Sequence, residues 1–261
     1  QLFQSGTFLP LGVNFVQVTV GPTGFVGAPE PVLVGFIRSL FPDGRTPDLV
    51  VSLAAPAALF ARKHRQELFP DTPLLFAAVD ERVLRDTPLA EDEAAVTVLN
   101  DYSLLVDDIL RLLPETRQVF MIMGSGELGR YWRRELEDEF KRFQNRLTFE
   151  WSEKLTLPEI LHRCASLPEN SAIFYFAFGT DAAGVAYADE RVLAALHATA
   201  NVPLFADQAA HFGSGIVGGT MLATNALSRN TADVAVRLLN GAPPRNFRMK
   251  PQLPGPPTFD W

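Results

Sequence analysis

The sequence has little that would support covalent, metal or nucleic-acid chemistry. Its single cysteine, Cys164, excludes an internal disulfide and a cysteine-based metal site. The histidines also lack a pair with metal-ligand spacing; they are His64, His162, His197 and His211. Lys and Arg number 23 against 30 Asp and Glu, and no basic block is present. Because nucleic acid and anionic membranes select a basic face, this balance argues against both as partners.

Long apolar runs and common catalytic signatures are missing as well. No run approaches the roughly 18 apolar residues of a membrane-spanning helix. The G-x-S-x-G, Walker A and Cys/His signatures are absent. The chain is 47% hydrophobic and only 20% charged, so it can form a buried core. Its 261 residues allow one large domain or two of ordinary size.

Apolar strand-like segments alternate with helical patterns along the chain. We expect strands at 14–20, 48–53, 73–79, 95–99, 118–123, 147–151, 171–178 and 202–205. We expect helices at 32–41, 54–69, 101–113, 127–142, 157–166, 189–200 and 220–239. Residues 1–12 are irregular and 21–28 form a glycine-rich loop. The alternation predicts an α/β fold whose parallel sheets carry helices on both faces, in two runs at 14–99 and 118–205.

The stretch from Val202 to Gly219 changes character twice. It begins as an apolar strand, turns polar at Asp207 and Gln208, and continues into a glycine-rich run. In open parallel sheets, ligands bind outside the carboxyl ends of the strands. We therefore interpret the stretch as one wall of a cleft and as a crossing between two lobes. His211 lies in it, but no partner in the sequence would make it a base.

Residues Gly124 to Gly129 spell G-x-G-x-x-G between a predicted strand and a predicted helix. Glu150, at the end of the next strand, stands where a ribose-binding acid is expected in a dinucleotide-binding unit. The helix then continues with bulky residues, among them Tyr131, where a pyrophosphate cradle needs small ones. A second interpretation is a tight turn whose free amide groups face a cleft, with Tyr131 lining it.

Charged and polar side chains follow two other predicted strands. Asp80 and Glu81 come after the strand at 73–79, and Thr180 and Asp181 come after the strand at 171–178. Their position at carboxyl ends indicates ligand contact. The alternative is structural: Asp80 and Glu81 in a salt-bridged turn, and Asp181 as the cap of a turn.

Two long segments resemble a known family. They are PDLVVSLAAPAALFARKHRQELFPDTPLLFAAVDE and GIVGGTMLATNALSRNTADVAVRLLNGAPP, and the ending PTFDW is similar to the family's tail. The family is the substrate-binding proteins of ABC transporters with the type I periplasmic-binding fold. The match is closest to the branch that also serves as the extracytoplasmic sensor domain of bacterial histidine kinases.

This resemblance implies two Rossmann-like lobes joined by a hinge, with a ligand clamped in an interlobe cleft. The family's first strand is absent or divergent in residues 1–12. The implied N-terminal lobe is 1–100 with 214–242, the C-terminal lobe is 101–213, and 243–261 is a tail near the hinge. The implied ligand-binding residues are Ala54, Ala55, Pro56, Asp80, Glu81, Ser125, Gly126, Glu127, Tyr131, Gly179, Thr180, Asp181, Asp207 and Gln208.

The function that the resemblance implies is extracytoplasmic, periplasmic binding of a small-molecule solute. The partner is then a membrane permease, for ABC import, or the chain's own transmembrane kinase module, for ligand sensing. No catalysis, cofactor or metal is expected. The alternatives are a nucleotide-cofactor-dependent enzyme that uses the turn at 124–129 and a purely structural or interaction module.

Overall fold

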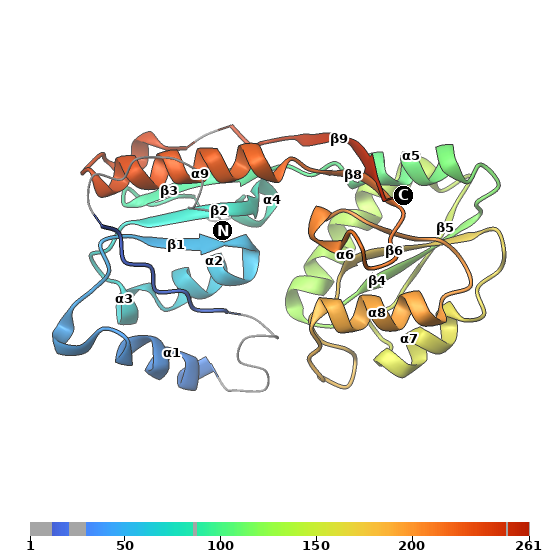
Figure 1. The fold of residues 1–261 in the computed structure, drawn as a ribbon, viewed down its shortest axis with the longest axis horizontal. Helices are drawn as coiled ribbons and strands as arrows, with labels where there is room; N and C mark the ends of the chain where they lie inside the picture. Colours follow the sequence, from blue (N-terminus) through green and yellow to red (C-terminus); the bar gives the residue numbers. More distant parts are fainter. Residues whose placement is uncertain (1–11, 21–29, 86–87, 249, 261) are drawn as a thin grey trace. The chain divides into compact units, whose positions relative to one another are not determined.

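The computed structural model describes residues 12–20, 30–85, 88–248 and 250–260. It divides the chain into two compact α/β units. Unit 1 is Gln1–Asn100 with Ala223–Leu253, and unit 2 is Asp101–Leu222 with Pro254–Trp261. The backbone therefore passes between units three times, after Asn100, Leu222 and Leu253 (Figure 1). The loop predicted at 21–28 and nearly all of the irregular segment predicted at 1–12 lie outside the described residues.

Unit 1 contains a parallel sheet in the order β1-β2-β3. Its strands are β1 (Val50–Leu53), β2 (Leu74–Asp80) and β3 (Glu93–Val98). Its helices are α1 (Glu30–Ser39), α2 (Ala54–Lys63), α3 (Arg65–Leu68), α4 (Glu81–Leu84) and α9 (Thr224–Leu239), with 3-10 turns η1 (Pro42–Gly44) and η4 (Pro244–Asn246). The one long helix predicted at 54–69 is interrupted at His64, which ends α2 and begins α3.

The core of unit 1 explains why β2 is almost continuously apolar. Helix α2 packs on β1 and β2, while α9 packs on β2 and β3 (Figure 1). Of the β2 residues, Leu75 and Phe76 have no exposed surface. A strand in a parallel sheet that is covered by helices has no solvent face, so it needs apolar side chains on both sides.

The strand predicted at 14–20 is wrong. Residues 12–20 have no regular secondary structure, and no ladder joins them to a strand among the described residues. Phe15 and Val16 are exposed, whereas Val18 and Val20 pack against the cluster formed by α1, α2 and α3. The alternating pattern thus reflects one-sided packing of an extended segment, because alternation records burial and not the hydrogen-bond partner that a strand requires.

Unit 2 contains a four-stranded parallel sheet in the order β5-β4-β6-β7. Its strands are β4 (Gln118–Met123), β5 (Thr148–Trp151), β6 (Ser171–Ala177) and β7 (Leu204–Ala206). Its helices are α5 (Tyr102–Leu112), α6 (Glu127–Glu139), α7 (Leu157–Cys164) and α8 (Asp189–Thr199), with 3-10 turns η2 (Phe140–Phe143) and η3 (Ala209–His211). The predicted cap Asp101 accepts a hydrogen bond from the Ser103 backbone N–H at 3.1 Å.

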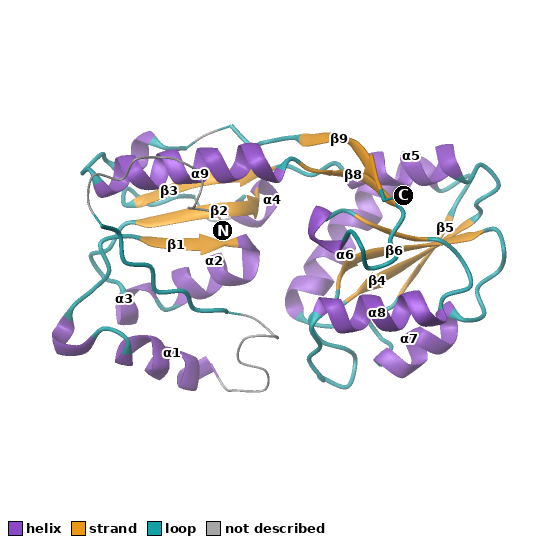
Figure 2. Cartoon of the chain, in the orientation of Figure 1, coloured by secondary structure: helices purple, strands orange, loops and turns teal. Residues whose placement is uncertain are grey.

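Strand β6 shows how helices cover both faces of this sheet. Ile173 and Tyr175 point into the cluster made with α7 and α8, which lie side by side in Figure 2. Phe174 and Phe176 point the other way, where their rings meet Tyr102 of α5. Successive side chains of a strand leave on opposite faces, so the period of two in β6 builds two separate cores.

The segment after the glycine-rich run differs from the prediction. Residues Gly218–Leu222 form strand β8, which pairs antiparallel with β9 (Pro254–Phe259), so helix α9 begins only at Thr224. The two units also divide the chain at positions other than those of the expected lobes. Residues 214–222 belong to unit 2 and not to the first lobe, and the tail at 243–261 is divided between the units at Leu253.

Contacts with residues that are distant in sequence explain why residues 218–222 form a strand and not the start of a helix. Asp108 of α5 accepts hydrogen bonds from the backbone N–H of Thr220 at 2.8 Å and from its hydroxyl at 2.6 Å. Gly219 lies so close to α5 that a Cβ there would stand 2.0 Å from Leu105 Cδ1. Strand β8 is thus held in an extended form by α5 and β9, neither of which is a neighbour in sequence.

None of the helices in the described ranges combines the length and the apolar composition that a membrane span requires.

Candidate functional site

The residues predicted to bind ligand follow the carboxyl ends of five parallel strands. They follow β1 and β2 in unit 1, and β4, β6 and β7 in unit 2. Within each unit the strands are parallel, so these ends share one edge of the sheet. Whether the residues contact a ligand stays a prediction. The hydrogen bonds and exposure of each predicted residue show which of these side chains are already engaged within the protein.

The turn after β1 holds an unusual backbone. Ala54 has a φ of 63°, in the left-handed region that an alanine rarely occupies. Helix α2 begins there, and among the described residues no side chain caps its first turn. Ala54 and Pro56 are exposed and Ala55 is buried. The exposed first turn of α2 leaves backbone N–H groups available to an anionic or polar group.

Asp80, at the end of β2, is engaged by its own unit. Its carboxylate accepts hydrogen bonds from Arg82 Nε at 2.9 Å and Nη2 at 3.0 Å, and it caps α4 through the Arg82 backbone N–H. The Asn100 backbone N–H also donates to it at 3.3 Å. The structural alternative of a salt-bridged turn therefore describes Asp80, while neighbouring Glu81 is exposed.

Packing requires two of the three glycines in the G-x-G-x-x-G motif, Gly124 and Gly129. A Cβ on Gly124 would stand 1.7 Å from the carbonyl oxygen of Phe178, and one on Gly129 would stand 2.0 Å from the carbonyl oxygen of Gly124. The turn after β4 thus lies directly against the turn after β6. This close approach explains Gly124, and the contact of α6 with the Gly124 carbonyl explains Gly129, without a bound dinucleotide.

The acid expected to bind a ribose is also paired. Glu150 of β5 forms two hydrogen bonds with Arg163 of α7, at 2.8 and 2.7 Å, and a third with Gln118 at 2.5 Å. An arginine that holds a carboxylate in this bidentate way occupies the oxygens that a ribose would need. The Glu150 carboxylate is thus already engaged within unit 2.

The remaining predicted residues of the β4 turn differ in exposure. Ser125 is half-buried, and its hydroxyl donates to the Asp181 carbonyl at 2.5 Å. Gly126 and Glu127 are exposed at the start of α6. Tyr131 is half-buried, with its ring 5.5 Å from that of Trp132. The exposed pair offers backbone and carboxylate groups to a ligand, whereas Ser125 ties the turn to the loop after β6.

Asp181, in the loop after β6, has a structural role. Its carboxylate accepts from the backbone N–H groups of Leu157, Ala183 and Val185 at 2.9 to 3.1 Å. Burial alone would raise the pKa of Asp181, but these N–H groups outweigh it and lower the pKa below its usual value. Asp181 is 2% exposed, so the expectation of a capped turn holds for it. The half-buried Gly179 and Thr180 flank this turn.

Asp207 and Gln208, directly after β7, complete the predicted set. Gln208 is exposed. Asp207 is half-buried, and its Oδ1 atom has no hydrogen-bond partner in the part of the chain that is described. Burial raises the pKa of Asp207 to about 7. A hydrogen bond from the Asp207 backbone N–H opposes this rise, and the negative charge of Asp189 adds to it. Asp207 is thus unlike Asp80 and Asp181, whose carboxylates the fold pairs.

Sequence reasoning missed two contacts that Tyr175 of β6 makes in unit 2. From the sequence, Tyr175 is an ordinary core residue of a strand. In the structure, its hydroxyl donates to Asp189 at the start of α8. His211 appeared to be isolated, and its ring lies edge-on to Tyr175 with 5.3 Å between centroids. No local pattern marks these contacts, because they join β6, α8 and η3.

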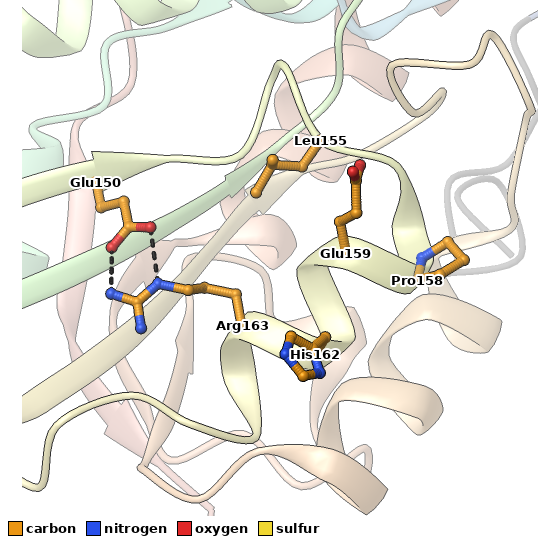
Figure 3. Close-up of a pocket in the computed structure, with 6 residues that line it drawn as sticks. All are labelled: Glu150, Leu155, Pro158, Glu159, His162 and Arg163. Atoms are coloured by element: carbon orange, nitrogen blue, oxygen red, sulfur yellow. Dashed lines mark hydrogen bonds and ion pairs between the residues drawn. The ribbon is translucent and has the colours of Figure 1, made fainter.

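A shallow pocket of about 420 Å³ lies elsewhere in unit 2 (Figure 3). Its lining residues are Glu150, Leu155, Pro158, Glu159, His162 and Arg163. In Figure 3 the Glu150–Arg163 ion pair lies along one side of it. None of the predicted ligand-binding residues lines this pocket.

Metal and thiol chemistry receive no support from the described residues. They contain no group of three or more His, Cys, Asp or Glu side chains that could hold a metal ion. Cys164 is buried in the cluster between the sheet and α7, and burial raises the pKa of its thiol to about 12. A thiol in this environment is an inert core residue.

Comparison with known proteins gives no match to a family model and no match to a curated protein sequence. Solved structures do match. An ABC domain from Streptococcus pneumonia in complex with L-Trp is 20% identical with a TM-score of 0.63, over 87% of this chain and 75% of that one. A conserved domain protein from Vibrio cholerae O1 biovar El Tor is 17% identical with a TM-score of 0.65, over 89% and 76%.

A third similar structure is a substrate-binding protein with adhesive properties from Clostridium difficile, in a ligand-free, open form. It is 16% identical with a TM-score of 0.56, over 85% of this chain and 74% of that chain. At these identities the likeness concerns architecture, and it agrees with the α/β units and parallel sheets described above. This chain has the type I periplasmic-binding fold.

Proposed function

We propose that this chain binds a small-molecule solute without converting it, and that the carboxyl ends of its parallel strands supply the contacts. The observation that carries the proposal is the type I periplasmic-binding fold with exposed polar or backbone groups at these ends. The similar structures include a substrate-binding protein and a domain in complex with L-Trp. Both names describe binding, and neither describes catalysis.

The contacts that we propose come from the predicted residues that the fold leaves exposed or unpaired. In unit 1 they are the first turn of α2 at Ala54 and Pro56, with Glu81. In unit 2 they are Gly126, Glu127, Asp207 and Gln208. The turns that carry these groups are held by the hydrogen bonds of Asp80, Ser125 and Asp181 described above.

A thermal-shift screen against amino acids, aromatic acids, sugars and nucleosides tests the proposal. A ligand at a hundredfold excess over its Kd stabilises the fold by about 2.7 kcal/mol, which raises Tm by several degrees. Gln208→Ala should weaken this effect without changing the Tm of the free protein. Gln66→Ala, an exposed glutamine of α3 that precedes the amino end of β2, is the matched control. Equal ligand effects in the two variants would count against the β7 end as a contact.

We further propose an extracytoplasmic location, where the bound solute serves ABC import or sensing by a receptor kinase. The two routes differ in their partner, a membrane permease in the first and a kinase module in the second. The full-length gene distinguishes them. A membrane span and kinase module in the same polypeptide supports sensing, whereas a separate neighbouring permease gene supports import.

A further inference from the structure

Gln252 is placed at the point where the connections between the two units meet unit 1. The connections follow Asn100, Leu222 and Leu253, and Gln252 is the neighbour of Leu253. The hydrogen bonds that Gln252 makes in unit 1 lead to the chain segments that carry the other two connections. A single residue is thus bonded to segments that are far apart in sequence.

The backbone of Gln252 is paired with the end of β3. Its N–H donates to the Thr97 carbonyl at 2.9 Å, and its carbonyl accepts from the Leu99 N–H at 3.0 Å. These bonds form a parallel bridge between Val98 and Gln252. The segment that ends at Gln252 therefore lies alongside β3, next to the first connection at Asn100.

The side chain of Gln252 is bonded to the second connection. Its Nε2 donates to the carbonyl of Ala223 at 2.7 Å, and Ala223 is the first residue of unit 1 after that connection. The Oε1 atom of Gln252 is buried and has no hydrogen-bond partner in the part of the chain that is described. The donor end of the amide is thus the end that is engaged, and the bond to Ala223 fixes its orientation.

The first connection is held by hydrogen bonds on both of its sides. In unit 1 the N–H of Asn100 donates to Asp80 at 3.3 Å, and the Asn100 carbonyl accepts from Arg82 Nη2 at 2.7 Å. In unit 2 the next residue, Asp101, already caps α5 through the Ser103 N–H at 3.1 Å. Rotation at this connection therefore falls on the backbone bonds between Asn100 and Asp101.

The second and third connections are equally short. Leu222 pairs with Pro254 at the end of the ribbon that β8 and β9 form in unit 2. In unit 1 the residues nearest to this pair are Ala223 and Gln252, which the side-chain bond joins. Leu253, which is 62% exposed, is the single residue between Gln252 and Pro254. Both connections thus run from a paired position in unit 2 to a bonded position in unit 1.

We propose that the Gln252 side chain couples the three connections, so that backbone rotation at one of them takes place together with rotation at the others. A hinge consists of a few residues that absorb changes in φ and ψ. If Ala223 rotated alone, its carbonyl would leave Gln252 Nε2, and a partly buried amide would lose its partner at a cost in free energy. The inference concerns the free protein and is independent of solute binding.

The competing interpretation is that the Gln252 side chain only fills space. In that case the backbone bonds to β3 hold the segment, and the amide is dispensable. Two substitutions distinguish the interpretations, because both keep the backbone bonds and the approximate shape of the side chain. Gln252→Met has no polar donor, and Gln252→Glu has a carboxylate that donates no hydrogen bond when it is ionised.

The test measures the distance between a spin label on each unit by pulsed electron paramagnetic resonance at pH 7. The labels are attached at two exposed positions, through Gln66→Cys in α3 and Ala198→Cys in α8. The native thiol of Cys164 is buried and does not compete for the label. We expect Gln252→Met and Gln252→Glu each to widen the distribution of distances relative to the labelled parent protein. Gln118→Met, which removes an amide donor within unit 2, is the matched control and should leave the width unchanged.

Hydrogen exchange of the backbone amides provides a local readout. The loss of one hydrogen bond should raise exchange in the peptide at 220–226 about fivefold in both Gln252 variants. The amides of β2 and β4, in the cores of the two units, should keep the protection of the parent protein. This comparison separates a local release of the connections from general unfolding.

A distribution of unchanged width in either Gln252 variant would overturn the proposal, because both variants lack the donor. Widening in Gln118→Met would overturn it as well, since the effect would then not be specific to the connections. The result is separate from the proposed function. The thermal-shift screen can succeed in a protein whose connections are uncoupled, and the coupling can persist in a protein that binds none of the screened solutes.

Discussion

At the scale of the residue, the turn at Gly124 shows how one missing Cβ positions a candidate site. The backbone there approaches the Phe178 carbonyl so closely that only glycine fits. Ser125 then bonds the Thr180 and Asp181 carbonyls through its N–H and its hydroxyl. The ends of β4 and β6 are thereby fixed to each other before any ligand binds.

We predict that Gly124→Ala destabilises unit 2 by about 2–3 kcal/mol, because the new methyl group overlaps a backbone oxygen that cannot rotate away. Urea unfolding followed by tryptophan fluorescence measures the change. Gly126→Ala is the control in the same turn. Its Cβ would meet only Thr180 Oγ1 at 3.9 Å, so its cost should stay below about 1 kcal/mol. Equal costs at the two positions would contradict the packing explanation.

At the scale of the element, β8 and β9 form a two-stranded antiparallel ribbon in unit 2. Gly218 and Gly219 of β8 have φ values of 107° and 139°, which side chains rarely adopt. At Gly218 a Cβ would stand 2.3 Å from the Thr258 carbonyl of β9. These glycines let the ribbon pair tightly and lie against α5.

Gly218→Val should therefore impair folding of unit 2, by more than about 2 kcal/mol, since strain at positive φ adds to the clash with β9. Gly213→Val is the matched control. It also has positive φ, at 80°, but no atom lies within 4 Å of its Cβ position. It should show only the backbone strain, roughly 1–2 kcal/mol. Hydrogen exchange at the β8 amides would locate the damage, and wild-type protection there in Gly218→Val would refute this account.

At the scale of the whole molecule, buried titratable groups make the free energy of unfolding depend on pH. The folded-state pKa of Asp207, about 7, is above its unfolded value near 3.9. The folded protein then holds a proton that the unfolded chain releases between these values. The contribution to stability is complete below about pH 4 and is lost as pH rises to about 7. The lowered pKa of His211 has the opposite sign: its contribution is lost as pH falls below about 6.5.

We predict that Asp207→Asn reduces the loss of stability between pH 5 and pH 8, by an amount on the order of a few kcal/mol. The measurement is the urea midpoint of the wild type and the variant across this range. Glu169→Gln, which removes an exposed acid of the same unit, is the control and should follow the wild type. A wild-type slope in Asp207→Asn would mean that this carboxyl group does not hold the proton.

Elements whose pattern is local follow from the amino-acid sequence alone. Strands β4 and β6 are apolar runs, α5 is amphipathic with Asp101 as its cap, and their alternation specifies an α/β fold with parallel sheets. Polar residues after such strands are also a local signal, so the candidate ligand-binding positions could be predicted although their contacts could not.

Contacts between elements, in contrast, depend on the folded arrangement of the chain. The pairing of β8 with β9, the engagement of Asp80 by Arg82 and Asn100, and the meeting of Tyr175 with Asp189 and His211 all depend on partners from other elements. Periodicity records which side of an element is buried but not what lies against it. Gly124 and Gly129 therefore resembled a dinucleotide motif in sequence, whereas in the folded chain Gly124 lets the turns after β4 and β6 approach each other and Gly129 lets α6 pack on the Gly124 carbonyl.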